Sequence, residues 1–214
     1  TATDSTNDLT KSPAYSNPSN SPEYWGTVVS VPNVVPGGQL PVLHWFTNNA
    51  SAHDGSGGGR CAIFFNGQFF DNVGADLHGQ SSSGFPKKSY DFDLNSGFKM
   101  EWDTTPMNTT PKVNSFNLLT TYPDKANLRN ILSYRTFAAA GVPGHWAQPV
   151  QVRRNNAFFS VAHMVEDGDS DYLQRAPGLD DQGALYKMYN TFTDASGGEK
   201  KSRKWEGSQD LTPC

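Results

Sequence analysis

Alternating apolar and polar positions predict short β-strands along most of the chain. The segments with this pattern are residues 28–35, 40–46, 61–65, 68–70, 73–77, 88–94, 115–122, 148–153 and 158–165. Asn66-Gly67 separates two of these segments and is a preferred pair for a two-residue hairpin turn. Asn155-Asn156 separates the last two, and asparagine tolerates the positive φ that such a turn requires. We therefore predict two β-hairpins.

The hydrophobic period changes to that of an α-helix between Lys125 and Ala140. The apolar residues recurring at helical spacing are Leu128, Ile131, Leu132, Tyr134, Phe137 and Ala138. Pro123-Asp124 is a start signal and Gly141 a stop signal. A shorter helical segment is predicted at 171–175. Several antiparallel strands with one main helix predict an α+β fold, namely an antiparallel β-sheet with one helix.

The composition of the two ends differs from that of the middle. Residues 1–23 are mostly Ser, Thr, Asn and Pro, which is typical of a linker or of an extended arm that lies on another copy of the chain. Residues 24–196 are predicted to form one globular domain, and residues 197–214 a polar tail.

Charge and hydropathy exclude two classes of function. The chain has 21 acidic and 17 basic residues, so it lacks the basic surface expected of a nucleic-acid-binding protein. It also has no run of about 18 apolar residues, so no membrane span is predicted. The 13 Phe, 8 Tyr and 5 Trp residues favour a packed, β-rich body.

Two cysteines and two sequons bear on the cellular compartment. Cys61 and Cys214 could both be reduced thiols, but a cysteine at the last position favours a disulfide between them. Such a disulfide would contribute about 5 kcal/mol in the chain-entropy account. Asn49-Ala-Ser and Asn108-Thr-Thr are candidate glycosylation sites. Together these features favour an extracellular or cell-surface location.

Residues 78–94, HGQSSSGFPKKSYDFDL, contain the main candidate for chemistry. Gly79 and Gly84 have the separation of the glycines in a phosphate-binding P-loop, but the lysines come two positions late and a strand follows. The serines do not have the GxSxG spacing of a hydrolase nucleophile. The P-loop and the serine nucleophile are therefore rejected.

The two lysines at positions 87 and 88 remain as candidates. Lys88 shares a strand face with Tyr90 and Phe92, so it is expected to point to the packed side of the sheet. An ammonium is costly there unless an anion or another partner meets it. Lys88 is therefore a paired structural lysine or a ligand lysine, whereas Lys87 is expected to face solvent.

No metal site is predicted from the residues. The five histidines are scattered along the chain. The acidic segment at 166–171 has aspartates at alternate positions, as calcium loops do, but it lacks the required glycine and the final glutamate. It is interpreted as an acidic turn.

Four segments in this order resemble the CotH (spore-coat protein H) kinase-like family. The segments are residues 78–94, 117–143, 149–175 and 183–187, with PKKSY at 86–90 and DKANLRN at 124–130 as the strongest parts. The resemblance covers about residues 62–187. Two positions depart from the family pattern: His78 replaces an arginine, and Asn156 replaces a glycine.

The resemblance implies an atypical, secreted protein-kinase fold that uses ATP with Mg²⁺ or Mn²⁺. It implies that Lys88, or its neighbour Lys87, contacts the phosphates, and that Ser81 and Ser83 lie in the loop over them. Glu166 would lie near the hinge that contacts adenine. The helix 125–140 would occupy the place of the kinase αC helix.

The same resemblance puts the family's catalytic and metal-binding aspartates in a second lobe, after the LYK motif, and we recognise no such segment after Lys187. We therefore expect the N-terminal, nucleotide-lobe portion of a secreted CotH-like kinase, which binds ATP and acts on a protein substrate only with a second lobe. The alternative is a non-catalytic extracellular module for structure, self-assembly or cell-surface attachment, in which the arm 1–23 contacts further copies.

Overall fold

The computed structural model describes residues 10–11, 24–25, 40–102, 112–176, 178–179, 184–188 and 198–203. The strands of the central sheet are β3 (Val42–Phe46), β4 (Gly59–Phe65), β5 (Gln68–His78), β6 (Ser89–Asp93), β9 (Ser115–Thr120), β10 (Ala147–Arg154) and β11 (Ala157–Glu166). Three α-helices lie in the described part of the chain: α1 (Ala50–His53), α2 (Arg129–Ala139) and α3 (Ser170–Arg175). Short strands form three separate pairs: β1 (Thr10–Lys11) with β2 (Tyr24–Trp25), β7 (Met100–Glu101) with β8 (Lys112–Val113), and β12 (Ala184–Met188) with β13 (Gly198–Arg203).

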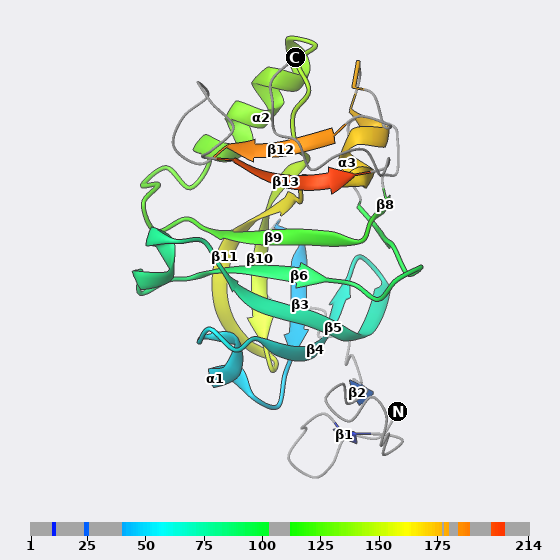
Figure 1. Cartoon of the computed structure of the whole chain (residues 1–214). Helices are drawn as coiled ribbons and strands as arrows, with labels where there is room; N and C mark the ends of the chain where they lie inside the picture. The colour runs from blue at the N-terminus through cyan, green and yellow to red at the C-terminus, as the bar shows by residue number, and fades with distance from the viewer. Residues whose placement is uncertain are drawn as a thin grey trace.

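The central sheet closes into a seven-stranded barrel, with strand order β10-β11-β9-β6-β5-β4-β3 (Figure 1). All neighbouring strands are antiparallel except β10 and β3, which are parallel. This parallel pair aligns residues 151–154 with residues 42–45 and joins the two edges of the sheet. Closure leaves the barrel without exposed edge strands.

The predicted α+β fold, an antiparallel sheet with one main helix like a kinase N-lobe, is wrong. The described residues are mostly β, and the sheet is a closed barrel with three short helices. The prediction failed because strand alternation reports which face of a strand is buried, whereas closure depends on pairing between segments more than 100 residues apart.

The local predictions fared better, since both predicted hairpins are present. β4 and β5 meet at Asn66 and Gly67, whose φ values are 48° and 78°. β10 and β11 meet at Asn155 and Asn156, with φ values of 49° and 64°. The predicted strand 73–77 is the second half of the long strand β5.

The barrel interior is filled by large side chains that alternate with outward-facing residues. Trp45 is completely buried and packs edge-on against Tyr90, Phe92 and Phe159, with ring centroids 4.9, 5.2 and 5.8 Å apart. Phe92 also stacks on Phe116, with centroids 5.0 Å apart. Aromatic side chains therefore form a substantial part of the core, beside aliphatic residues such as Leu43, Ile63 and Val152.

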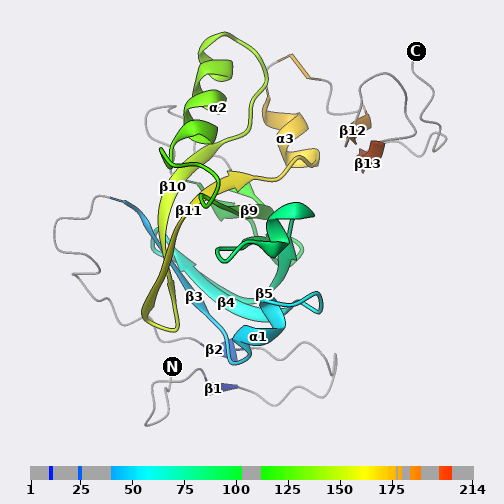
Figure 2. The same ribbon diagram turned by 90° about the vertical axis from the view of Figure 1, so that its left-hand side faces the viewer.

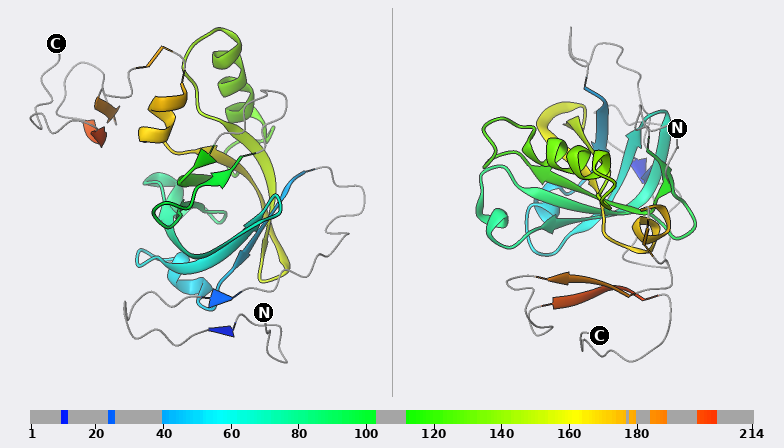
Figure 3. Two further views of the ribbon diagram at one scale, coloured as in Figure 1. Left: turned by 90° about the vertical axis from the view of Figure 1, so that its right-hand side faces the viewer. Right: turned by 90° about the horizontal axis from the view of Figure 1, so that it is seen from above.

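The helices lie outside the barrel rather than forming a layer. α1 lies at one end, whereas α2 and α3 lie at the other (Figure 2). Seen from above, α2 lies over the barrel strands, and β12 and β13 form a separate ribbon beside them (Figure 3). Ile131 is the buried residue of α2, and Leu132 and Phe137 are exposed. None of the described helices is long and apolar enough to cross a membrane.

Several predictions from the sequence fall outside the described residues. These are the strand 28–35, the sequon at Asn108 and the pairing partner Cys214. The division into residues 1–23, 24–196 and 197–214 stays a prediction. At the other sequon, Asn49 is exposed and caps α1, because its side-chain oxygen accepts hydrogen bonds from the Ala52 amide and the Ser51 hydroxyl.

The predicted disulfide between Cys61 and Cys214 is not seen. Cys61 is a free thiol on β4 that is completely buried, and burial raises the pKa of this thiol well above its ordinary range. We expect Cys61, in a Cys214→Ser variant, to resist a water-soluble thiol reagent in the native state and to react fully after denaturation. Rapid labelling of the native variant would contradict the buried position of the thiol.

Candidate functional site

The predicted site residues divide between two pockets. The first, here called the helix–sheet pocket, has a volume of about 310 Å³ and is lined by His78, Asn117, Leu119, Tyr134, His145, Val165, Glu166, Asp167, Gly168, Tyr172, Leu185 and Tyr186. The second, here called the barrel-mouth pocket, has a volume of about 480 Å³ and is lined by Asp54, Pro86, Lys87, Lys88, Tyr90, Phe158, Phe159, Ser160 and Val161. Glu166 therefore lines one pocket and the two lysines line the other.

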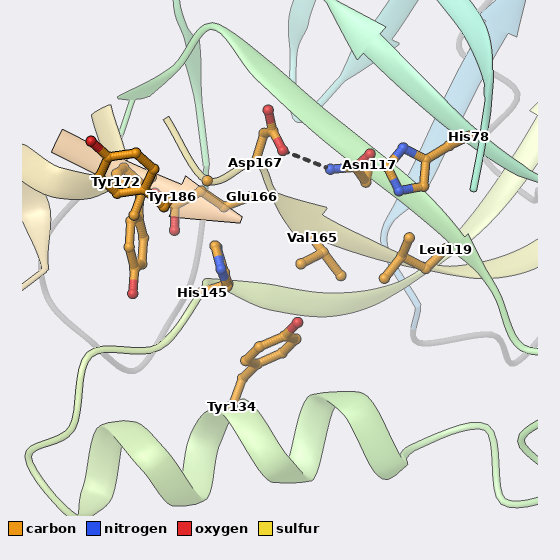
Figure 4. A pocket seen from close by; sticks show the side chains of 12 residues that line it. His78, Asn117, Leu119, Tyr134, His145, Val165, Glu166, Asp167, Tyr172 and Tyr186 are labelled. Atoms are coloured by element: carbon orange, nitrogen blue, oxygen red, sulfur yellow. Dashed lines mark hydrogen bonds between the residues drawn. The ribbon is translucent and has the colours of Figure 1, made fainter. Parts of the chain in front are cut away.

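The helix–sheet pocket lies between α2 and the outer face of the barrel (Figure 4). On β9, Phe116 and Leu118 point into the core, so the intervening Asn117 and the next residue, Leu119, point outward into the pocket. His78 ends β5 just before the Gly-Ser segment, and Tyr134 reaches the pocket from α2. β5, β9 and α2, which are distant in sequence, thus meet here.

Aromatic rings form one wall of this pocket. His145 stacks on Tyr172, with ring centroids 4.4 Å apart, and contacts Tyr134 edge-on at 5.5 Å. Burial lowers the pKa of His145, and the nearby Arg175 guanidinium lowers it further. The neutral form of His145 is therefore favoured, and its ring lies face to face on that of Tyr172.

Glu166 is fixed by a buried ion pair. Its carboxylate accepts hydrogen bonds from the Arg175 guanidinium, with Nε 3.0 Å from Oε1, and from the Trp146 amide at 3.1 Å. The guanidinium also lies 3.6 Å from the centroid of the Trp146 ring. Burial raises the pKa of Glu166, and Arg175 opposes this effect. The side chain of Glu166 thus joins the end of β11 to α3, and its oxygens are engaged within the protein.

The acidic turn after Glu166 begins α3. Asp169 caps this helix, because its side chain accepts hydrogen bonds from the amides of Asp171 and Tyr172 at 2.8 and 3.1 Å. Asp171 pairs with Lys99. The Asp167 carboxylate accepts a hydrogen bond from the side-chain amide of Asn117 at 3.3 Å. Within the described ranges, no group of three His, Cys, Asp or Glu residues could hold a metal ion.

Two buried polar atoms on the pocket residues have no partner among the described residues. They are Oδ1 of Asn117 and Nδ1 of His145. A buried acceptor without a partner costs about 1–3 kcal/mol. A ligand that donates hydrogen bonds at this wall would satisfy such atoms.

The two lysines immediately precede β6 and both line the barrel-mouth pocket, but they bind different partners. Lys88 donates a hydrogen bond to the backbone oxygen of Asp54 at 3.0 Å, at the barrel mouth. Lys87 donates to the Thr121 hydroxyl at 2.7 Å and to the backbone oxygen of Val161. Lys87 is therefore half-buried rather than facing solvent as expected, and burial lowers its pKa.

Ser81 and Ser83 lie on a 3₁₀-helical turn, Ser81–Gly84, between β5 and β6. Gly79 precedes this turn with a φ of 90°, and a Cβ atom there would clash with the Ser82 side chain. Ser83 donates a hydrogen bond to the backbone oxygen of Gln80 at 2.5 Å. The turn is thus held by local hydrogen bonds, and neither Ser81 nor Ser83 lines either pocket.

Most of the residues that line the helix–sheet pocket were not predicted from the sequence. Asn117, Tyr134 and Tyr172 lie inside the segments that carried the family resemblance, but Tyr134 was noted only as an apolar position of a helix. His145 lies between two of those segments, and nothing in its local pattern marks it as a pocket residue.

Comparison with known proteins agrees with the resemblance seen in the sequence. No curated protein matches the chain. A family model described as CotH kinase protein matches residues 75–212, which includes all the lining residues of the helix–sheet pocket and extends beyond the LYK motif. This match covers more than half of the chain, and the protein therefore belongs to the CotH kinase family.

Proposed function

We propose that this protein binds ATP in the helix–sheet pocket and serves as a nucleotide-binding unit of a secreted CotH-type protein kinase. One observation carries the proposal. All four segments that resemble the family contribute to this one pocket: His78 from the first, Asn117, Leu119 and Tyr134 from the second, residues 165–168 and Tyr172 from the third, and Leu185 and Tyr186 from the fourth. The convergence of these distant segments on one cavity indicates that they share a ligand.

The pocket wall suits an aromatic base with hydrogen-bond donors. The stacked rings of His145 and Tyr172 offer a flat apolar surface, on which a purine would stack. The exocyclic amine of adenine is a donor, and Asn117 Oδ1 is an acceptor without a partner in the described part of the chain. These two features favour the base end of ATP at this wall.

Lys87 is the better candidate for the phosphates. Its ammonium binds Thr121, which lies two residues beyond the pocket residue Leu119, a step of about 7 Å along an extended strand. This half-buried ammonium donates to two neutral oxygens, the Thr121 hydroxyl and the Val161 carbonyl. An anionic phosphate would therefore stabilise its charge. Lys88, which lines the barrel-mouth pocket together with Lys87, donates instead to the backbone oxygen of Asp54.

We propose that the divalent metal binds as part of the nucleotide complex. Among the described residues, no cluster of side chains fits a metal held by the protein alone, and Glu166 and Asp169 are engaged in other hydrogen bonds. Mg²⁺ commonly binds through substrate phosphates and few carboxylates. The proposal therefore assigns no metal ligand in this chain.

The test is calorimetric titration with ATP, with and without Mg²⁺ or Mn²⁺. We expect saturable binding that Lys87→Met weakens by about tenfold or more, since hydrogen bonds to charged groups contribute about 1.5–3 kcal/mol. Lys125→Met, which removes an exposed lysine outside both pockets, is the matched control.

Lys88→Met decides between the two lysines. A larger loss of ATP affinity in Lys88→Met than in Lys87→Met would contradict the assignment of the phosphates to Lys87. Absence of ATP binding at millimolar concentration would contradict the proposal as a whole. That outcome would favour the alternative function, an extracellular structural or attachment module that retains the fold.

A further inference from the structure

We propose that the barrel-mouth pocket is a second ligand site, which binds a small organic anion with an aromatic or alkyl group. This site lies at the opposite end of β11 from the helix–sheet pocket: Phe158 and Phe159 are near the start of the strand, and Val165 and Glu166 are at its end. α1, whose C-cap is Asp54, borders the same pocket. The proposal does not require ATP binding, because its anion contact is Lys88, although Lys87, assigned above to the phosphates, lines this pocket too.

The charges around this pocket leave a surplus of positive charge. The carboxylate of Asp54 pairs with Arg154, with Oδ1 3.0 Å from the guanidinium, and accepts a hydrogen bond from the Tyr90 hydroxyl at 2.6 Å. This carboxylate is therefore compensated by Arg154. Lys88 binds the neutral backbone oxygen of the same residue at 3.0 Å.

Lysine has three donors, so the ammonium of Lys88 keeps donors for a further acceptor beside its bond to Asp54. Lys87 lines the pocket as well and donates to neutral oxygens. A monoanionic group such as a carboxylate would offset this surplus of positive charge.

The other walls of the pocket are apolar. Phe158 is 60% exposed, and Phe159 and Pro86 also line the pocket. Phe159 is held in place by Arg154, whose guanidinium carbon lies 4.0 Å from the ring centroid. A hydrophobic group of a ligand would cover Phe158 while its anionic group contacts Lys88. This combination of a cation and an aromatic wall defines the ligand class.

The barrel gives this pocket a rigid frame. Lys88 immediately precedes β6, Tyr90 lies on β6, and Phe159 on β11, and Trp45 packs against both Tyr90 and Phe159 from inside the barrel. Ligand sites often lie in the mouths of β-barrels, where packed strands fix the side chains before binding. Little rearrangement is needed for a ligand to enter.

The test uses 2-naphthoate as the probe and backbone amide NMR as the measurement. We expect saturable shift changes centred on Asp54, Lys88 and residues 158–161. Lys88→Met should weaken binding by about tenfold or more, because it removes the charge and keeps the length of the side chain. Phe158→Ala should weaken it too, whereas Phe69→Ala, at an exposed phenylalanine on β5 outside this pocket, should not.

A neutral analogue keeps the test decisive if a variant fails to fold. 2-Naphthalenemethanol has the same ring system without the charge, so it should bind the unaltered protein much more weakly than 2-naphthoate. Equal binding of the two probes, or shift changes centred on Tyr134 and His145, would overturn the proposal. Loss of ATP binding in the calorimetric experiment would leave this result unaffected.

Discussion

Replacing Arg175 with leucine is expected to destabilise the protein by about 3–5 kcal/mol, because it leaves the Glu166 carboxylate buried without its counter-ion. Glu166 is only 2% exposed, and the guanidinium contacts both of its oxygens. Arg175 also donates a hydrogen bond to the Gly144 oxygen and stacks on Trp146, so the variant loses these contacts as well. Chemical denaturation of the variant and the wild type at pH 7 measures the loss.

The pH dependence of this loss identifies its cause. Burial raises the pKa of Glu166 above its ordinary value of 4.5, and removing Arg175 raises it further. A carboxyl group with a raised folded-state pKa destabilises the fold as pH rises from the unfolded-state pKa towards the folded-state pKa. We therefore expect the difference between variant and wild type to shrink as the pH is lowered to about 4.5 and below.

Two further variants complete this experiment. The double variant Arg175→Leu with Glu166→Leu should recover part of the lost stability, since it removes the unpaired charge. Lys112→Met breaks the exposed ion pair between Lys112 and Glu101 and should cost at most about 1 kcal/mol. A double variant less stable than Arg175→Leu alone would show that packing, rather than charge, causes the loss.

Replacing Trp45 with alanine is expected to destabilise the protein by about 3–5 kcal/mol, as is usual for a large buried aromatic residue. Trp45 is completely buried on β3 and packs against Tyr90, Phe92 and Phe159 from three other positions around the barrel. The residue also lies in the parallel pair of β3 and β10, opposite Arg154, where the barrel closes. Its loss should therefore loosen the closure of the sheet.

Thermal and chemical denaturation should show this loss, and amide exchange should show faster opening of β3 and β10 than of β5 and β6. Phe98→Ala is the matched control, because Phe98 is 66% exposed and its truncation should leave stability nearly unchanged. Equal stability of the Trp45→Ala variant and the wild type would contradict the central position of Trp45 in the barrel core.

The two lysines and His145 show which features of the candidate site could be predicted from the local sequence pattern. Strand alternation predicted that Lys87 and Lys88 point to opposite faces; they bind different partners, but both line the barrel-mouth pocket. Which partners the two lysines meet depends on the alignment of β6, β9 and β11, and the residues around position 87 do not indicate this alignment. The pocket residue His145 is similar: its neighbours Tyr134 and Tyr172 are distant in sequence and reach it only in the fold.

The amino-acid sequence by itself determined the local elements and the family of this protein. Turn residues with positive φ set both hairpins, helical spacing set most of α2, and the four ordered segments indicated the CotH kinase family, which the family match confirms. These features depend on neighbouring residues or on fixed motifs. Only the tertiary structure decided that the sheet closes into a barrel and that the predicted site residues divide between two pockets. The physical reason is that closure and pocket formation depend on contacts between distant segments, whose pairing is selected by the packing of the whole core.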